Sequence, residues 1–401
     1  MPGICIYFHA HQPYRIKKTS FFDLGNYPDF ENKKANQFYL RKVINTAYLP
    51  AFHMLQDIVE SSGGEFKYAL SLTGSLIDQI KEDFPEVLRW ISDIIKQKSL
   101  ELITETFYHT IAYFYSRDEF IQQVKLQRDL LFDLFGKQMT VFRNAELAYR
   151  SDLAIQLDNI GFEGTIVEGS TRLLHNRSPN FLYCDALKDS FRLLVRNQKY
   201  SELFSNFRSP REYNIDTLAE NVVNEIAELK DDLILIGFDI ENLGEHHNKF
   251  TGIFKFFKKF VNESLKSGKI RFIHPSYALN YYQPLYSLEI YSPVTWHGNN
   301  KDLSAWNGNI FQKEALRYLY SIENKIKQTN NSDLIELWRK LQSTDHLLYM
   351  SSEEMINGKI ADYFSPFTSV YESFLAFMNA ASSLDIYAQN LLHKKAIQLF
   401  S

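Results

Sequence analysis

The sequence predicts an α/β fold built on a parallel sheet, followed by a helical C-terminal region. Two observations support this prediction. Short β-rich runs alternate with longer segments of helical periodicity through the first two-thirds of the chain, and the remainder has helical patterns throughout. Strand–helix–strand alternation at this spacing is typical of βαβ units, whose parallel sheet is either doubly wound or closed into a barrel.

Eight short runs rich in β-forming residues are predicted strands. Polar residues follow directly after four of them, near residues 4–8, 100–103, 141–142 and 233–238. Because ligands of parallel-sheet enzymes bind at the carboxyl ends of the strands, we expect these four clusters to converge. The predicted strands are Ile4–His9, Lys67–Leu72, Leu100–Thr104, Thr140–Phe142, Gly164–Val167, Phe191–Val195, Asp232–Phe238 and Ile270–Ile273.

Apolar residues recur at helical spacing between these strands and again towards the C-terminus. A chain of 401 residues exceeds what one hydrophobic core usually supports, so we expect two domains, residues 1–285 and residues 286–401. The predicted helices are Glu86–Lys96, Asp118–Leu134 and Asp216–Leu229 in the first domain, and Asn309–Lys327, Ser332–Leu348 and Tyr371–Leu392 in the second.

Composition excludes some classes of protein. The formal net charge of −4 argues against a nucleic-acid binder, which normally carries a basic excess. Cys5 and Cys184 lie too far apart in the sequence to suggest a disulfide framework, and no leader or long apolar run is evident. We therefore expect a cytoplasmic protein that does not span a membrane. Its oligomeric state cannot be read from the sequence.

The first polar cluster is His9-Ala-His11-Gln12-Pro13, at the end of the first predicted strand. Alternate residues on a strand point to the same side, so His9 and His11 share one face. Two imidazoles in this arrangement can bind a divalent metal, or they can hydrogen-bond sugar hydroxyls together with the Gln12 amide. Two structural histidines at a strand end are a third interpretation.

Two further clusters carry carboxylates. Arg143, Asn144 and Glu146 follow an apolar strand, and Glu146 is either a salt-bridge partner or a nucleophile kept ionised by nearby donors. Asp239 and Glu241 follow the most apolar strand, two residues apart on one side. Because two neighbouring carboxylates repel each other, one of them tends towards a raised pKa, as a general acid requires.

Glu101 lies within an apolar run, where an unpaired charge is costly, so we expect it to have a partner or a substrate. Glu105 and His109, which follow the same run, are weaker candidates. A Gly/Asn-rich loop, residues 296–309, contains two tryptophans, of which Trp306 could stack on a ligand or simply pack in a core. No dinucleotide, P-loop, serine-elbow or CxxC motif is present.

Taken together, these motifs resemble glycoside hydrolase family 57, which includes α-amylases and 4-α-glucanotransferases. HAHQP, SLELI, FRNAELAY, GFDIENLGEHH and DLSAWNGN are similar to the five family motifs, in order along most of the chain. The tail QSTDHLLYMSSE, followed by YFSPF, is similar to the amylase-like subgroup. Lys98 stands where the family often has glycine, and Arg143 stands where it often has an aromatic residue.

The resemblance implies an incomplete seven-stranded (β/α) barrel followed by a helical domain that contributes to the cleft. It implies a retaining hydrolase or transglycosylase that acts on α-1,4-glucans or maltooligosaccharides without a metal or other cofactor. Glu146 would be the nucleophile and Asp239 the general acid/base; some amylase-like members lack one carboxylate, but here both are present. The residues expected to contact sugar are His9, His11, Gln12, Glu101, Arg143, Glu241, His246, Asp302 and Trp306.

Two alternatives remain open at this stage. The first is a metal-dependent hydrolase or deacetylase on a similar barrel, with His9 and His11 as ligands and Asp239 and His246 completing the set. The second is a non-catalytic glucan-binding protein that keeps an enzyme scaffold. The intact pair of carboxylates argues against the second alternative.

Overall fold

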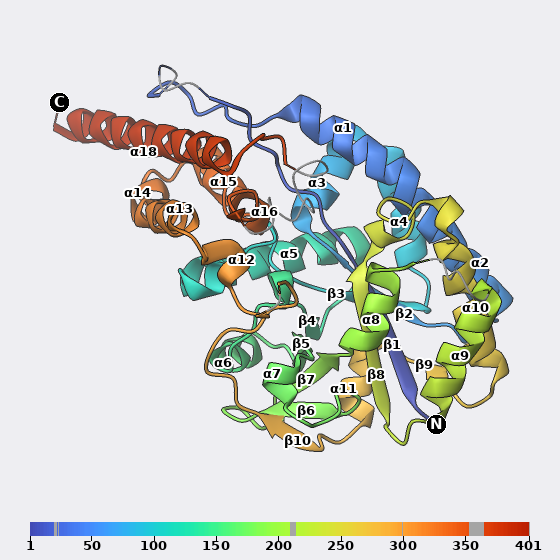
Figure 1. Cartoon of the computed structure of the whole chain (residues 1–401). Helices are drawn as coiled ribbons and strands as arrows, with labels where there is room; N and C mark the ends of the chain where they lie inside the picture. The colour runs from blue at the N-terminus through green and yellow to red at the C-terminus, as the bar shows by residue number, and fades with distance from the viewer. Residues whose placement is uncertain (20–21, 23, 209–213, 299, 353–364, 401) are drawn as a thin grey trace.

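Seven parallel strands form a nearly closed barrel at the centre of the molecule (Figure 1). The structure is a computed structural model, and it describes residues 1–401 except 20–21, 23, 209–213, 299, 353–364 and 401. The predicted fold class is confirmed. The barrel strands are β1 (Gly3–Ala10), β2 (Tyr68–Leu72), β3 (Leu100–Ile103), β4 (Val141–Phe142), β5 (Gly164–Glu168), β7 (Arg192–Arg196) and β8 (Leu233–Asp239).

The barrel consists of two well-paired halves, β8–β1–β2–β3 and β4–β5–β7. A single bridge between Thr104 and Phe142 joins β3 to β4, and a single pair between Arg196 and Leu235 joins β7 to β8. Because each junction rests on so few backbone hydrogen bonds, the barrel is nearly rather than fully closed. The junction between Thr104 and Phe142 lies where β3 and β4 end, beside the predicted polar clusters.

All eight predicted strands are present, and the eighth, β9 (Arg271–Phe272), pairs with the start of β1. Two further strands were not predicted. β6 (Leu182–Asp185) runs antiparallel to β7, and β10 (Tyr286–Leu288) pairs with β6. Both are only three or four residues long and form a ribbon outside the barrel. Neither has the longer run of apolar residues from which a buried strand is predicted.

The helices of the barrel pack around the strands through apolar faces. On α4 (Pro85–Ile95), for example, Val87, Ile91 and Ile94 recur at helical spacing and are buried. The predicted helices correspond to α4, α5 (Arg117–Phe135) and α9 (Ile215–Glu228), with ends within two residues of the prediction. The other helices here are α1 (Lys33–Val43), α2 (Leu49–Ser61), α3 (Gly74–Asp83), α6 (Asp152–Asn159), α7 (Thr171–Leu174), α8 (Gln198–Ser205), α10 (Ile253–Lys266) and α11 (Pro275–Tyr281).

The C-terminal helices gather on one side of the barrel and share a core of their own (Figure 1). Trp306 and Trp338 lie in this core, together with Ile111 and Ala148 from the loops that follow β3 and β4. The helical region therefore packs on the loops at the carboxyl ends of the barrel strands. Its helices are α12 (Ser304–Asn307), α13 (Ile310–Ser321), α14 (Glu323–Gln328), α15 (Ser332–Lys340), α16 (Thr344–Leu348) and α18 (Val370–Phe400).

Two of the predicted C-terminal helices are interrupted. The segment Asn309–Lys327 is divided into α13 and α14, and Ser332–Leu348 is divided into α15 and α16. The proposed domain boundary at residue 285 stays a prediction, and β10, which lies beyond it, still pairs with the barrel-side strand β6. Part of the tail motif, within residues 353–364, lies outside the described residues. In the described part of the chain, no helix has both the length and the apolar character needed to cross a lipid bilayer.

Candidate active site

The ends of β1 and β8 bring His9 and Asp239 together. The two residues are direct neighbours in the parallel register, and Nδ1 of His9 lies 2.9 Å from Oδ1 of Asp239. Ser71 of β2 is the neighbour of His9 on the other side. Polar residues that follow four strands thus meet at one end of the barrel, as expected for parallel strands.

Glu146 follows β4 in a short 3-10 turn with a left-handed backbone, at φ 58° and ψ 16°. A non-glycine residue rarely adopts this conformation, and when it does so inside a structure the surroundings must hold it there. The backbone carbonyl of Glu146 accepts from the Trp296 amide, and its carboxylate accepts from three side chains. Because backbone strain of this kind clusters at functional sites, it supports a functional role for Glu146.

Both oxygens of the Glu146 carboxylate have donors. Thr344 Oγ1 donates to Oε1 over 2.8 Å and Trp296 Nε1 donates to Oε2 over 2.8 Å, while His109 Nε2 lies 3.2 Å from Oε1. Burial alone would raise the pKa of this carboxyl group, but the bonds from His109 and Trp296 lower the pKa to about 2. Glu146 is therefore ionised at neutral pH, as a nucleophilic carboxylate must be.

A chain of polar contacts joins Glu146 to Asp239. From Glu146 it passes to His109, whose Nδ1 donates to Oε2 of Glu105 over 2.6 Å, and Oε1 of Glu105 lies 3.1 Å from Nε2 of His9. The other nitrogen of His9 contacts Asp239. Burial alone would lower the pKa of His109, but Glu105 and Glu146 raise the pKa to about 10, so this imidazole is a cation at neutral pH.

The neighbouring carboxyl groups of Asp239 and Glu241 have pKa values that are shifted in opposite directions. The Asp239 side chain is 36% exposed, against 12% for Glu146, and opens towards solvent. Burial alone would raise the pKa of Asp239, but the His9 hydrogen bond lowers it. Burial and the neighbouring Asp239 charge raise the pKa of Glu241 to about 7. One member of the pair does have a raised pKa, as the sequence predicts, and that member is Glu241.

Glu241 is held from the far side by Tyr48, whose hydroxyl donates to Oε1 over 2.6 Å. Tyr48 lies in a π-helical turn, Ile44–Tyr48, between α1 and α2. Such turns occur often at functional sites. Gly244, at φ 117°, lets the loop after β8 pack on this turn, because a Cβ there would lie 1.9 Å from the Thr46 carbonyl oxygen.

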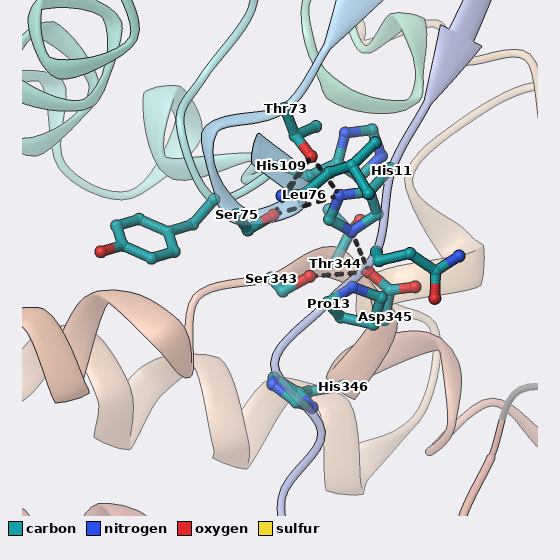
Figure 2. Close-up of polar contacts among 12 residues, drawn as sticks. His11, Pro13, Thr73, Ser75, Leu76, His109, Ser343, Thr344, Asp345 and His346 are labelled. Carbon is teal, nitrogen blue, oxygen red and sulfur yellow. Dashed lines mark hydrogen bonds and ion pairs between the residues drawn. The ribbon is translucent and has the colours of Figure 1, made fainter. Parts of the chain in front are cut away.

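His11 links the barrel to the helical region, as Figure 2 shows. Its Nδ1 lies 2.9 Å from Thr73 Oγ1, and its Nε2 lies 2.9 Å from Oδ2 of Asp345 at the start of α16. Burial alone would raise the pKa of Asp345, but His11 holds the pKa well below its ordinary value. The His11 ring also stacks on His109, with 4.4 Å between the ring centroids.

Three other predicted residues lie around this cluster. Arg143 is fully buried, with Nη1 3.6 Å from Oε2 of Glu105 and its guanidinium over the ring of Trp296. Gln12 is buried and accepts a hydrogen bond from Arg15, so its amide oxygen is occupied by protein. His246 is exposed as a residue, but partial enclosure of its imidazole lowers its pKa, and the charge of Asp239 opposes this shift.

Three predicted residues are not brought to the cluster. Glu101 accepts hydrogen bonds from the backbone and the hydroxyl of Ser276, at the start of α11 and at the far end of β3. Asp302 accepts from the Ser304 amide. Trp306 is fully buried in the helical core, so its ring faces protein rather than an open cleft.

The structure adds five residues that the sequence ranked low or passed over, namely Glu105, His109, Trp296, Thr344 and Asp345. The sequence favours Glu105 and His109 only weakly as site residues. In the loop that contains Trp296, it favours Trp306 as the ring that could stack on a ligand. Thr344 and Asp345 fall inside a segment predicted as one continuous helix. The sequence Ser343-Thr344-Asp345 is nevertheless typical of a helix start, and this signal could have located the break.

Among the described residues, one group offers metal-ligand atoms close together. His9, Glu105 and His109 each have such an atom, all within 4.8 Å of one another. Within this group, Nδ1 of His109 and Oε2 of Glu105 lie 2.6 Å apart, at hydrogen-bond length. His11 is not part of this group, and both its nitrogens have protein partners in Thr73 and Asp345, whereas the metal-dependent alternative takes His9 and His11 as its ligands.

Comparison with known proteins decides the family. Residues 5–291 match the family model described as glycosyl hydrolase family 57. The chain belongs to glycosyl hydrolase family 57. It is therefore a glycoside hydrolase, as the motifs predict.

A relative from Methanocaldococcus jannaschii, named "Putative alpha-amylase", is 29% identical over 96% of this chain and 85% of its own length. The family 57 branching enzyme of Pyrococcus horikoshii has a similar structure, with a TM-score of 0.68 and 14% identity over 90% of this chain and 87% of that one. The 4-α-glucanotransferase of Thermococcus litoralis gives a TM-score of 0.66 and 15% identity over 86% of this chain and 56% of that one. At these identities the two structures establish the fold.

Proposed function

We propose that this family 57 enzyme is a retaining hydrolase or transglycosylase of α-1,4-glucans, with Glu146 as nucleophile and Asp239 as general acid/base. The observation that carries the proposal is the difference between the two carboxylates. Glu146 is buried, bonded on both oxygens and ionised, whereas Asp239 opens to solvent beside a second carboxyl group that holds a proton near neutral pH. Two carboxyls in different environments suit the two roles.

In the proposed reaction, Glu146 attacks the anomeric carbon while Asp239 gives its proton to the departing glycosidic oxygen. The Asp239–Glu241 pair titrates as a unit, so the proton that the pair holds is available to Asp239 when a sugar covers it. Asp239 then removes a proton from water or from an acceptor hydroxyl, whose oxygen displaces Glu146 from the sugar. Water gives hydrolysis, and a second glucan gives transfer.

The α-glucan substrate is inferred from relatives. The names of the matched proteins are those of an α-amylase, a branching enzyme and a 4-α-glucanotransferase, all of which refer to α-glucan chemistry. The geometry that receives a sugar in this proposal is the exposed edge of Asp239 with His246 beside it. We therefore propose maltooligosaccharides as the substrates to test first.

The experiment compares the wild-type protein, Glu146→Gln and Asp239→Asn on maltotriosyl fluoride, whose leaving group needs no acid. Asp239→Asn is expected to accumulate a glycosyl-enzyme mass on Glu146 and to regain turnover with azide. Glu146→Gln is expected to form no adduct and to lose turnover. An active Glu146→Gln variant, or activity that a chelator abolishes and zinc restores, contradicts the proposal.

Product analysis answers the two finer questions. Proton NMR of the first product gives the anomeric configuration, and a β-anomer appearing first contradicts retention. Chromatography of the products of maltotetraose shows whether chains longer than the input appear. Longer chains indicate transfer, and shorter chains alone indicate hydrolysis.

A further inference from the structure

We propose that Glu105 is a positioning residue that orients both catalytic carboxylates through the two histidines on either side of it. The inference rests on the proposed roles of Glu146 and Asp239. It goes beyond them, because neither the motifs nor the carboxylate pair assigns a role to Glu105. The observation behind it is that one buried carboxylate contacts both His9 and His109.

Glu105 is fully buried, and its two oxygens have separate partners. Oε2 accepts from His109 Nδ1 over 2.6 Å and lies 3.6 Å from Nη1 of Arg143. Oε1 accepts from Ser71 Oγ over 2.6 Å and lies 3.1 Å from His9 Nε2. A buried charge is tolerated only when it is paired and hydrogen-bonded, and here four groups surround it.

Each histidine uses its second nitrogen for a catalytic carboxylate. His109 Nε2 contacts Oε1 of Glu146 and His9 Nδ1 contacts Oδ1 of Asp239. The bond that an imidazole makes at one nitrogen determines which proton the other nitrogen carries and how the ring is turned. Glu105 acts on the two rings in different ways, through a hydrogen bond at His109 and through its charge, which lies 3.1 Å from Nε2 of His9.

The rings have little freedom to find another arrangement. His109 stacks on His9 with 4.9 Å between ring centroids and on His11 with 4.4 Å. The charged and titratable groups that contact Glu105 come from β1, from the loop after β3 and from the end of β4, and they are His9, His109 and Arg143. Without the charge of Glu105, these three groups would lose the one carboxylate that they share.

The chain provides a matched control in Glu101, four residues earlier on the same segment. Its half-buried carboxyl group also has hydrogen-bond partners, but these belong to Ser276 at the far end of the strand. Replacing Glu101 by Gln thus tests the loss of an enclosed carboxyl group from the same segment of the chain. It does so without touching either histidine.

The experiment measures kcat and KM of Glu105→Gln, Glu105→Asp and Glu101→Gln on maltotriosyl fluoride, with circular dichroism as a check on folding. For Glu105→Gln we expect kcat to fall about 100-fold with little change in KM, because the reacting groups are misplaced while the sugar contacts stay. Glu105→Asp is expected to recover part of this loss, because it keeps the charge. Glu101→Gln is expected to keep the wild-type kcat.

A second measurement reports on the histidines directly. In protein labelled with 15N-histidine, the proton between His109 and Glu105 is expected to give a far-downfield NMR signal that disappears in Glu105→Gln. A folded Glu105→Gln variant with wild-type kcat overturns the inference, and so does an equal fall in kcat for Glu101→Gln. If Glu105→Gln does not fold, absence of the downfield signal in the wild-type protein overturns it. Failure of the proposed function is distinct, because it appears as activity in Glu146→Gln.

Discussion

Thr344 donates its hydroxyl to Oε1 of Glu146 over 2.8 Å, although 198 positions separate the two residues in the sequence. The Thr344 amide also donates to the carbonyl of His109, over 3.0 Å. One residue at the start of α16 therefore contacts both the carboxylate of the proposed nucleophile and the backbone of His109, whose imidazole lies beside that carboxylate. The docking of the helical region on the barrel thus completes the surroundings of Glu146.

Replacing Thr344 by Val should lower kcat by roughly 10- to 100-fold, because hydrogen bonds to charged groups contribute about 1.5–3 kcal/mol. The two side chains have similar shapes, so the fold should persist and KM should change little. Steady-state kinetics on maltotriosyl fluoride measures the effect.

Thr329→Val is a suitable control for this variant. Thr329 is buried in the same helical region, but its hydroxyl donates to the Ile326 carbonyl instead of to a carboxylate. We expect wild-type kcat for this control. An unchanged kcat in Thr344→Val would show that the hydroxyl does not assist the nucleophile.

The pH dependence of the enzyme should reflect the Asp239–Glu241 pair. The pKa of Glu241 is raised to about 7, so the pair holds its proton below that pH and loses it as the pH rises. Because the acid step needs this proton, kcat/KM on a maltooligosaccharide should fall above about pH 7. In Glu241→Gln the second charge is absent, the pKa of Asp239 should decrease further, and this alkaline limb should move to lower pH.

Maltotriosyl fluoride is the control substrate for the pH profile, because its leaving group needs no protonation. The alkaline limb should be weaker or absent with the fluoride. A limb at the same pH in both the wild-type protein and Glu241→Gln would rule out the pair as its origin.

The sequence predicts the strands well because each is short, apolar and bounded by polar residues. It also predicts that His9, Glu146 and Asp239 meet, because parallel strands end at one edge of the barrel. The order of the motifs along the chain also indicates the family. This part of the site follows from the periodicity of the strands and from the topology alone.

What the sequence could not show are the contacts made by the ends of loops and helices. In the sequence, Glu101 and Glu105 both look like buried carboxylates. Only the three-dimensional structure shows that Glu101 accepts a hydrogen bond from Ser276, whereas Glu105 contacts His9. In the same way, Trp296 and Trp306 belong to one predicted loop, and tertiary packing decides which ring touches Glu146. The position of Thr344 at a helix start is not predicted by periodicity, because helical periodicity continues across the short break between α15 and α16.

The burial of Trp306 leads to a prediction about stability. Its ring lies in the core of the helical region, so Trp306→Phe should lower the free energy of unfolding by about 1–3 kcal/mol through incomplete filling of the space. The KM for maltooligosaccharides should not change. Urea denaturation and steady-state kinetics measure the two quantities. A raised KM with unchanged stability would instead assign the ring to sugar binding.

Trp296 allows the hydrogen bond and the ring to be tested separately. Its Nε1 donates to Oε2 of Glu146 over 2.8 Å, while its ring faces the guanidinium groups of Arg143 and Arg196 at 5.0 and 5.6 Å. Phenylalanine keeps a ring for the two cations but removes the donor, and leucine removes both. We therefore expect kcat to fall about tenfold in Trp296→Phe and further in Trp296→Leu.

The sign of the pH effect in Trp296→Phe follows from the role of the donor. The Trp296 bond helps to lower the pKa of Glu146 from 4.5 to about 2, so its loss should raise this pKa. A carboxylate whose pKa rises is protonated, and thus inactive as a nucleophile, at a higher pH than before. The acid limb of kcat/KM on maltotriosyl fluoride should therefore move upward, towards 4.5. An acid limb that stays in place while kcat falls would mean that Trp296 acts by packing rather than by holding the charge of Glu146.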